Sequence, residues 1–217
     1  MTVDRLIEKV TAFIMRSTSH GAELLLFGHP HAGIQIPAGT VEPGEAPEQA
    51  VVREAREETG LDALTLREYL GYTEDHFTGN HRLIREATRV YARPDPTSFD
   101  WAHFRAGLPV SLTGQHAGDF SQVRYEEWDR WPEPQYVTYA ITGWVSDAML
   151  CDTIKRYFYH LEFQGQTEER WGVNTDQHHF NLFWASLAQL PAIISPQDGW
   201  LEFLFKSQDK LHNKTLK

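Results

Sequence analysis

The chain has 217 residues, and its 20 Lys and Arg against 30 Asp and Glu give a formal net charge of −10. This acidic balance argues against a protein that binds duplex nucleic acid nonspecifically, because contacts with the phosphate backbone need a basic surface. The single cysteine, Cys151, excludes an internal disulfide framework, and without a signal-peptide pattern or an apolar run of the ~20 residues that span a membrane we expect a cytoplasmic protein with no membrane partner.

The first third of the sequence predicts strands around one helix. Apolar runs indicate strands at residues 10–16, 23–27 and 64–72 and a short extended piece at 34–37. A helix is expected over residues 47–59, because Pro47 suits the first helical position and Gly60 suits the position just past the end.

The middle of the chain is rich in proline and glycine from about residue 94 to 134, which indicates loops around short elements. We expect one short helix within residues 98–108, with Trp101, Phe104 and Leu108 on one face. A second helix is expected at residues 147–155, capped by Ser146.

The last part of the chain predicts strands at residues 136–141, 156–164 and 180–184, then a helix that starts near Gln197 and a polar tail, residues 207–217, that frays. We interpret residues 1–217 as a single domain. The chain has more residues than a compact domain of this kind needs, and we place the additional residues at about 83–153. We interpret this segment as an insertion that completes a substrate pocket or an interface.

Three carboxylates with helical spacing are the main candidates for chemistry. Glu54, Glu57 and Glu58 lie three and four residues apart, so the predicted helix places them on one face. Like charges this close repel each other, and a hard divalent cation with oxygen ligands, Mg²⁺ or Mn²⁺, relieves the repulsion. Taken alone, such a run is more often a solvated helix face.

The spacing of the whole segment is more specific. The dipeptide Pro43-Gly44 suits the centre of a type II turn that Glu45 closes. Gly39, Glu45 and the run Arg53–Leu61 (REAREETGL) match the Nudix box at every defined position. The chain therefore resembles the Nudix hydrolase superfamily. This resemblance implies an α/β Nudix fold, an α/β/α sandwich with a mixed β-sheet.

The resemblance also implies a reaction and a set of residues. Family members use Mg²⁺ or Mn²⁺ to hydrolyse the pyrophosphate bond of a nucleoside diphosphate linked to another group, by attack of water on phosphorus. Carried over to this sequence, the metal ligands are Glu54, Glu57, Glu58 and the carbonyl of Gly39. The catalytic residues are Glu54, Glu57 and Arg53, of which Arg53 orients the glutamates, and the identity of the base is left open. Glu45, Gly44 and Gly60 support the loop and the helix.

A further acidic residue from outside the box is also expected. Glu162 shares a strand face with His160, so this pair is a candidate base or supporting element, although a half-exposed sheet face is the commoner explanation. Other acidic candidates are Glu126, Glu127, Glu168, Glu169 and Asp176.

Two alternatives to the enzyme stay open at this point. One is a non-catalytic module that senses a nucleotide or regulates in response to it. The other is that the inserted segment serves dimerisation, so a homodimer is a candidate assembly, and this is compatible with the enzyme. For the enzyme and for the sensing module the partner is a small nucleotide-derived molecule, and no motif in the sequence identifies it.

Overall fold

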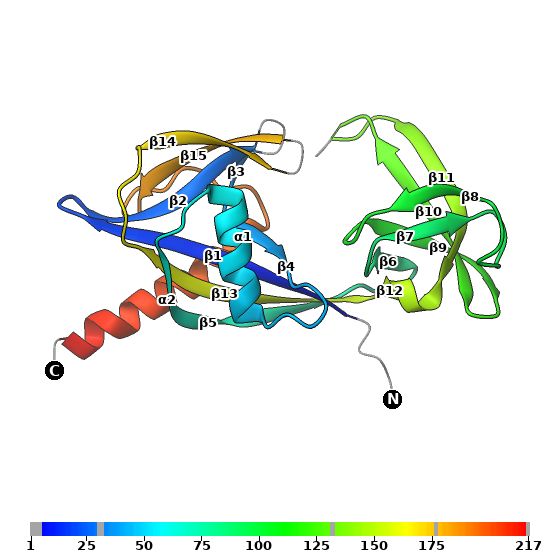
Figure 1. Cartoon of the computed structure of the whole chain (residues 1–217), viewed down its shortest axis with the longest axis horizontal. Helices are drawn as coiled ribbons and strands as arrows, with labels where there is room; N and C mark the ends of the chain where they lie inside the picture. The colour runs from blue at the N-terminus through cyan, green and yellow to red at the C-terminus, as the bar shows by residue number, and fades with distance from the viewer. Residues whose placement is uncertain (1–5, 30–32, 131–132, 176–177, 216–217) are drawn as a thin grey trace. The chain divides into compact units, whose positions relative to one another are not determined.

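The computed structural model describes residues 6–29, 33–130, 133–175 and 178–215. These residues divide into two compact units (Figure 1). The larger unit contains Glu8–Thr73 and Arg156–Lys217, and the smaller unit contains Glu74–Lys155 and the residues up to Ile7. Among the described residues, no helix has both the length and the apolar character that a membrane span requires.

A sheet of eight strands forms the middle layer of the larger unit, with the path β14-β15-β2-β1-β13-β5, while β3 pairs with β2 and β4 with β1. Its strands are β1 (Leu6–Thr18), β2 (Gly21–His29), β3 (Gly33–Gln35), β4 (Ala38–Thr40), β5 (Leu64–His76), β13 (Thr153–Phe163), β14 (Arg170–Thr175) and β15 (His178–Ser186). The pairs β1–β2 and β15–β2 are antiparallel. The neighbours β1 and β13 both enter this unit from the smaller one, so they run parallel and the sheet is mixed.

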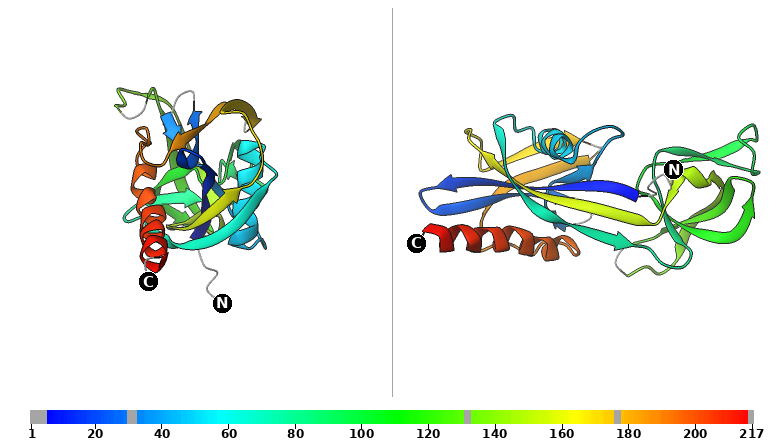
Figure 2. Two further views of the ribbon diagram at one scale, coloured as in Figure 1. Left: turned by 90° about the vertical axis from the view of Figure 1, so that its left-hand side faces the viewer. Right: turned by 90° about the horizontal axis from the view of Figure 1, so that it is seen from below.

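Two helices cover opposite faces of this sheet, α1 (Pro47–Thr59) and α2 (Gln197–Thr215) (Figure 2). On one face Val51 and Ala55 of α1 pack with Val10 and Leu161, and on the other face Leu204 of α2 packs in a second cluster. Central strands are apolar on both sides because both faces are covered. The arrangement confirms the predicted α/β/α sandwich with a mixed sheet.

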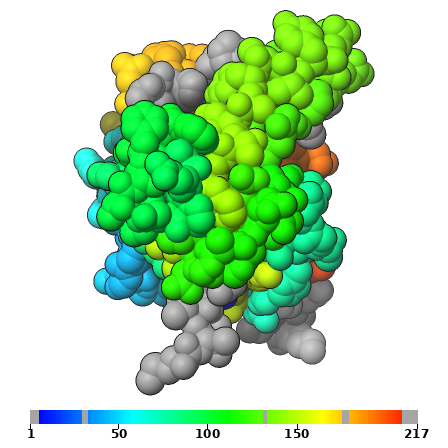
Figure 3. All heavy atoms as spheres, turned by 90° about the vertical axis from the view of Figure 1, so that its right-hand side faces the viewer, coloured from blue at the N-terminus to red at the C-terminus, as the bar shows by residue number. Residues whose placement is uncertain are grey.

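The smaller unit is a sheet of seven strands in the order β12-β6-β9-β10-β11-β7-β8. Its strands are β6 (His81–Ile84), β7 (Thr88–Tyr91), β8 (Asp100–Phe104), β9 (Pro109–Ala117), β10 (Phe120–Trp128), β11 (Val137–Ser146) and β12 (Leu150–Cys151). Ile84, Val90, Val123 and Val145 are fully buried in its core. Figure 3 shows one face of this unit. The segment that we interpret as an insertion, residues 83–153, lies within it.

Two predicted helices and the predicted tail differ from the structure. Residues 98–108 contain strand β8, which pairs with β7 and buries Phe104 while Trp101 is exposed, so a period of two replaces the expected helical face. Residues 147–155 form a 3₁₀ turn, η1 (Asp147–Met149), followed by β12 and the start of β13, and the Ser146 side chain makes no capping bond to a described residue. At the other end of the chain α2 continues to Thr215, so most of the expected tail is helical.

Candidate active site

The loop between β4 and α1 contains a tight turn at the predicted place. Gly44 has φ +82°, a value that favours glycine, and the Glu45 amide donates to the carbonyl of Glu42 at 3.0 Å. The side chain of Glu45 turns back and accepts a hydrogen bond from the Glu42 amide at 3.1 Å. The turn therefore places the Glu45 carboxylate beside the helix that follows.

Helix α1 begins and ends at the residues that the sequence indicates. Pro47 is at its start, and the Gln49 side chain accepts a hydrogen bond from the Ala46 amide at 3.1 Å. At the other end Gly60 has φ +71°, and its amide donates to the Arg56 carbonyl at 2.8 Å. The Trp171 indole donates to the carbonyl of Thr59 at 2.9 Å, which satisfies one of the last carbonyls of the helix.

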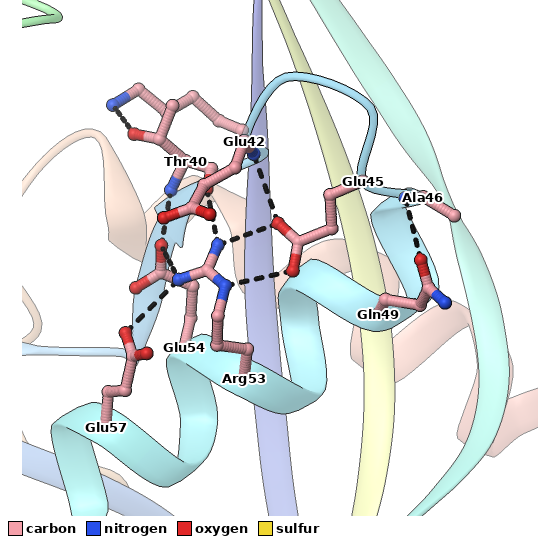
Figure 4. A network of polar contacts seen from close by, with 9 residues as sticks. Thr40, Glu42, Glu45, Ala46, Gln49, Arg53, Glu54 and Glu57 are labelled. Carbon is pink, nitrogen blue, oxygen red and sulfur yellow. Dashed lines mark hydrogen bonds and ion pairs between the residues drawn. The ribbon is translucent and has the colours of Figure 1, made fainter.

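Arg53 is the centre of a polar network (Figure 4). Its Nε and Nη2 atoms donate to the two oxygens of Glu45 at 2.9 and 2.8 Å, and Nη2 also donates to the Thr40 carbonyl at 2.9 Å. Nη1 lies 3.0 Å from Glu54 Oε1 and 3.2 Å from Glu57 Oε2. The bond from Arg53 lowers the pKa of Glu45, and the bonds to Glu45 and Glu54 raise the pKa of Arg53. This side chain thus joins the turn, strand β4 and the carboxylate face of α1.

Two of the helix carboxylates are held against strand β4. Glu54 Oε1 accepts from the Thr40 amide at 3.0 Å, and Glu58 Oε2 accepts from the Ala38 amide at 2.9 Å. Gly39 lies between these amides, and a Cβ atom added there would come 1.9 Å from Glu54 Cδ. The absence of a side chain at Gly39 therefore provides the space that the Glu54 carboxylate fills.

The pairing of β4 with β1 determines which carbonyls face the helix. Thr40 pairs with Lys9 and Gly39 pairs with Val10, and the Val41 amide donates to the Glu8 carbonyl at 3.0 Å. Because polar groups alternate along an antiparallel ladder, those of Gly39 face β1 and those of Thr40 face α1. The structure therefore turns the carbonyl of Gly39, an expected metal ligand, away from the three carboxylates.

The comparisons with known proteins decide the family. The family model described as the NUDIX domain matches residues 7–135, which is more than half of the chain. The chain belongs to the Nudix family. This membership confirms the family that the sequence predicted and makes the protein a Nudix-type pyrophosphohydrolase.

Two solved structures are among those similar to this Nudix protein. No curated protein matches it. One is a C. elegans Ap4A hydrolase, with 17% identity and a TM-score of 0.41, over 95% of this chain and 98% of that chain. The other is a C. elegans Ap4A hydrolase binary complex, with 14% identity and a TM-score of 0.39, over 84% of this chain and 81% of that chain.

The donor set on α1 fits a hard divalent cation. Nudix proteins generally use ions such as Mg²⁺ or Mn²⁺, and Glu54, Glu57 and Glu58 offer the carboxylate oxygens that these ions prefer. Within the described parts of the chain, no three acidic, histidine or cysteine side chains already converge as a metal site. Glu57 is 55% exposed and its contact is with Arg53, so its carboxylate is accessible to an ion.

The structure does not bring the candidate pair outside the box to α1. Tyr159 and Leu161 of β13 pack in the cluster under α1, so the alternating positions of His160 and Glu162 lie on the opposite face. They do share a face, as predicted, and Glu162 Oε2 accepts from Arg67 Nε at 2.5 Å. Of the other acidic candidates, Glu169 forms an ion pair with Arg16. Both Glu126 and Glu127 belong to the smaller unit, and Asp176 lies outside the described residues.

Three charged residues near the site, Lys9, Glu8 and Glu48, were not identified from the sequence. Lys9 Nζ donates to Thr40 Oγ1 at 2.6 Å, Glu8 accepts from the Tyr157 hydroxyl at 2.5 Å, and Glu48 accepts from the Tyr159 hydroxyl at 3.1 Å. These contacts depend on the pairing of β1 with β4 and on the position of β13. No local sequence signal predicts either of them.

Proposed function

We propose that this protein is a metal-dependent hydrolase that cleaves the pyrophosphate bond of a nucleoside diphosphate linked to another group. The observation that carries the proposal is the Arg53 network, which holds the Nudix carboxylates of α1 against the backbone of β4. Mg²⁺ or Mn²⁺ would be held by Glu54, Glu57 and Glu58. When bound, such an ion polarises phosphate oxygens and lowers the pKa of a coordinated water.

The protein residues have separate tasks in this proposal. Arg53 orients the carboxylates, and Glu45 orients Arg53 through two hydrogen bonds. Glu54 is partly buried and held by the Thr40 amide, so it is fixed in position, whereas Glu57 is exposed and accessible to an incoming ligand. A carboxylate from this set accepts the proton of the attacking water as the bond from water oxygen to phosphorus forms and the bond from phosphorus to the bridging oxygen breaks.

The test is hydrolysis of a panel of nucleotide sugars, dinucleotides and nucleoside triphosphates with Mg²⁺ or Mn²⁺, with products separated by chromatography. Glu57→Gln and Glu58→Gln are expected to lower the rate and to raise the metal concentration needed for half-maximal activity. Glu202→Gln is the matched control. Glu202 is an exposed helical glutamate that pairs with Lys206 at 3.1 Å, much as Glu57 pairs with Arg53 at 3.2 Å.

The outcomes separate the two functions that the sequence left open. Product formation that is unchanged in Glu58→Gln would refute the proposed site. A nucleotide that raises the melting temperature without being hydrolysed, with either metal, would instead favour the sensing module.

A further inference from the structure

A cavity of about 240 Å³ lies within the smaller unit, and the described residues that line it all belong to that unit. None of them belongs to the Nudix box, which is in the larger unit. The cavity is smaller than the roughly 300–1,000 Å³ of pockets that hold drug-sized molecules, so a ligand that fills it has few atoms.

The connection between β11 and β12 explains why the sheet of this unit encloses a cavity. Only the three residues of η1 separate Ser146, at the end of β11, from Leu150, at the start of β12, and this stretch of chain can span at most about 14 Å. Strands β6, β9 and β10 lie between β11 and β12 in the sheet order, and in a flat sheet the two strands would be about 19 Å apart. The sheet therefore curls on itself, and η1 closes the curl.

An irregularity in β9 brings two polar side chains to the wall of the cavity. In the pairing with β10, His116 faces Ser121. The next pair, Leu112 with Val123, is four residues back along β9 but only two residues along β10, and such a bulge bends the strand. At η1, Asp147 Oδ1 accepts from Ser121 Oγ at 2.6 Å, and Oδ2 lies 2.9 Å from His116 Nε2. Both oxygens of Asp147 are thus occupied, and they fix the His116 ring in place.

Arg82 and Asp152 are the charged groups of this wall that retain capacity for a ligand. Arg82 Nη1 donates to the carbonyls of Gly79 and His81 at 3.1 and 2.7 Å, and no described residue accepts from Nε or Nη2. Asp152 Oδ1 accepts from Thr153 Oγ1 at 3.0 Å, whereas Oδ2 has no donor among the described residues. One cationic and one anionic group are therefore available in the same cavity.

These two groups are neighbours that do not pair with each other. Strand β12 pairs Cys151 with Leu83 of β6, so the next position in register places Asp152 opposite Arg82. Within the described part of the chain, the two side chains form no ion pair. A guanidinium and a carboxylate that lie side by side complement a ligand that has an anionic and a cationic group close together.

The rest of the wall is apolar. It is formed by Leu112, Leu150 and Cys151, of which Leu150 is 5% and Cys151 1% exposed. Burial raises the pKa of Cys151 to about 11, and its Sγ donates to the Leu83 carbonyl at 3.6 Å. The thiol therefore stays neutral and contributes apolar surface rather than a nucleophile.

We propose that this cavity binds an α-amino acid with an aliphatic side chain. Arg82 receives the carboxylate, Asp152 receives the ammonium group, and the side chain lies against Leu112 and Leu150. A phosphate fits less well, because it has no cationic group for Asp152 and is repelled by that carboxylate. The site is independent of hydrolysis at α1 and gives the smaller unit a ligand of its own.

The first experiment measures the binding of glycine, alanine, valine and leucine to the whole protein by isothermal titration calorimetry. Glycine is expected to bind most weakly, because it leaves the apolar wall uncovered. Isocaproate, which is leucine without its ammonium group, and isoamylamine, which is leucine without its carboxylate, are each expected to bind roughly 10- to 100-fold more weakly than leucine, the factor for one lost hydrogen bond to a charged group. Saturable binding of none of the aliphatic amino acids, or equal affinities for leucine and both analogues, would overturn the proposal.

The second experiment uses two variants whose expected losses differ in kind. Asp152→Asn should remove the preference for leucine over isocaproate, and Arg82→Gln should remove the preference for leucine over isoamylamine. Arg89→Gln and Asp95→Asn are the matched controls, because both residues are in the smaller unit and neither is among the described residues that line this cavity. Wild-type preferences in both Asp152→Asn and Arg82→Gln, or leucine binding that is lost in Glu58→Gln instead, would overturn this site.

Discussion

Glu45 and Arg53 form a bidentate ion pair, in which Arg53 Nε donates to Glu45 Oε1 at 2.9 Å and Arg53 Nη2 donates to Glu45 Oε2 at 2.8 Å. Glu45 lies in the loop before α1 and Arg53 lies in the middle of that helix, so the pair fixes the loop against the helix. The guanidinium uses its remaining donors on the Thr40 carbonyl and on the carboxylates of Glu54 and Glu57. The position of the carboxylates therefore depends on a side chain that is not itself a metal ligand.

We expect Arg53→Lys to lower kcat by about 10- to 100-fold, because an ammonium group cannot bond both oxygens of Glu45 and also reach the Thr40 carbonyl. The measurement is steady-state hydrolysis of the best substrate from the panel, with the melting temperature recorded in parallel. Arg56→Lys is the control, because Arg56 is exposed on the same helix. Wild-type kcat in Arg53→Lys would contradict an orienting role.

Gly39→Ala tests the contact between β4 and the Glu54 carboxylate. A Cβ atom at this position would come 1.9 Å from Glu54 Cδ, so the carboxylate must move, and we expect most of the activity to be lost. Gly28→Ala is a suitable control in the same unit, since its nearest neighbour would be the Asn181 carbonyl at an ordinary 3.8 Å. Equal activities in the two variants would show that the position of Glu54 does not matter.

The parts of the fold with local signals were predictable. Pro47 and Gly60 mark both ends of α1 within the sequence itself, and the helix spans Pro47–Thr59 as predicted. The short helix expected within residues 98–108 was wrong because Trp101, Phe104 and Leu108 also fit a strand and the loop after it. Pairing with β7, a contact made outside the segment, decided between the two structures.

The residues of the site also divide into those that the local sequence identifies and those whose position depends on tertiary contacts. The spacing in the sequence identifies Arg53 and the glutamates of α1, because their geometry is set within one helix and one turn. The strand period places His160 and Glu162 on a common face, but it does not say which helix covers that face. That answer depends on the order of strands in the sheet, and so do the contacts of Tyr157 with Glu8 and of Tyr159 with Glu48.

The pH dependence of stability is expected to include a contribution from His160. Burial lowers its pKa below the usual 6.5, against the opposing influence of Glu68 and Glu162, while Arg67 acts in the same direction as burial. The unfolded chain therefore takes up a proton at a higher pH than the folded chain. Stability should fall as the pH drops through 6.5 toward the lowered pKa of the folded state.

The measurement for His160 is urea unfolding between about pH 7.5 and 5.5, a range in which histidine normally titrates. The stability of the wild type should fall more steeply with decreasing pH than that of His160→Gln. NMR titration of the imidazole gives its pKa directly, and a value at or above 6.5 would contradict the prediction. Because His160 lies on the face opposite α1, the pH profile of kcat is expected to be the same in both proteins.

Gly60→Ala is expected to destabilise the larger unit through backbone conformation alone. Gly60 has φ +71°, and a Cβ atom there would find its nearest neighbour, Val173 Cγ2, at a comfortable 3.7 Å. The cost is therefore that of a left-handed alanine, about 1–2 kcal/mol, and Gly60→Asn should cost less because asparagine tolerates this conformation better.

Gly199→Ala in α2 provides a control of opposite sign, because this glycine has open space around it and no positive φ. Alanine is there expected to stabilise by about 0.5–1 kcal/mol. Urea unfolding of the three variants measures both effects, and a Gly60→Ala variant as stable as Gly199→Ala would refute the left-handed cap as a source of stability for α1.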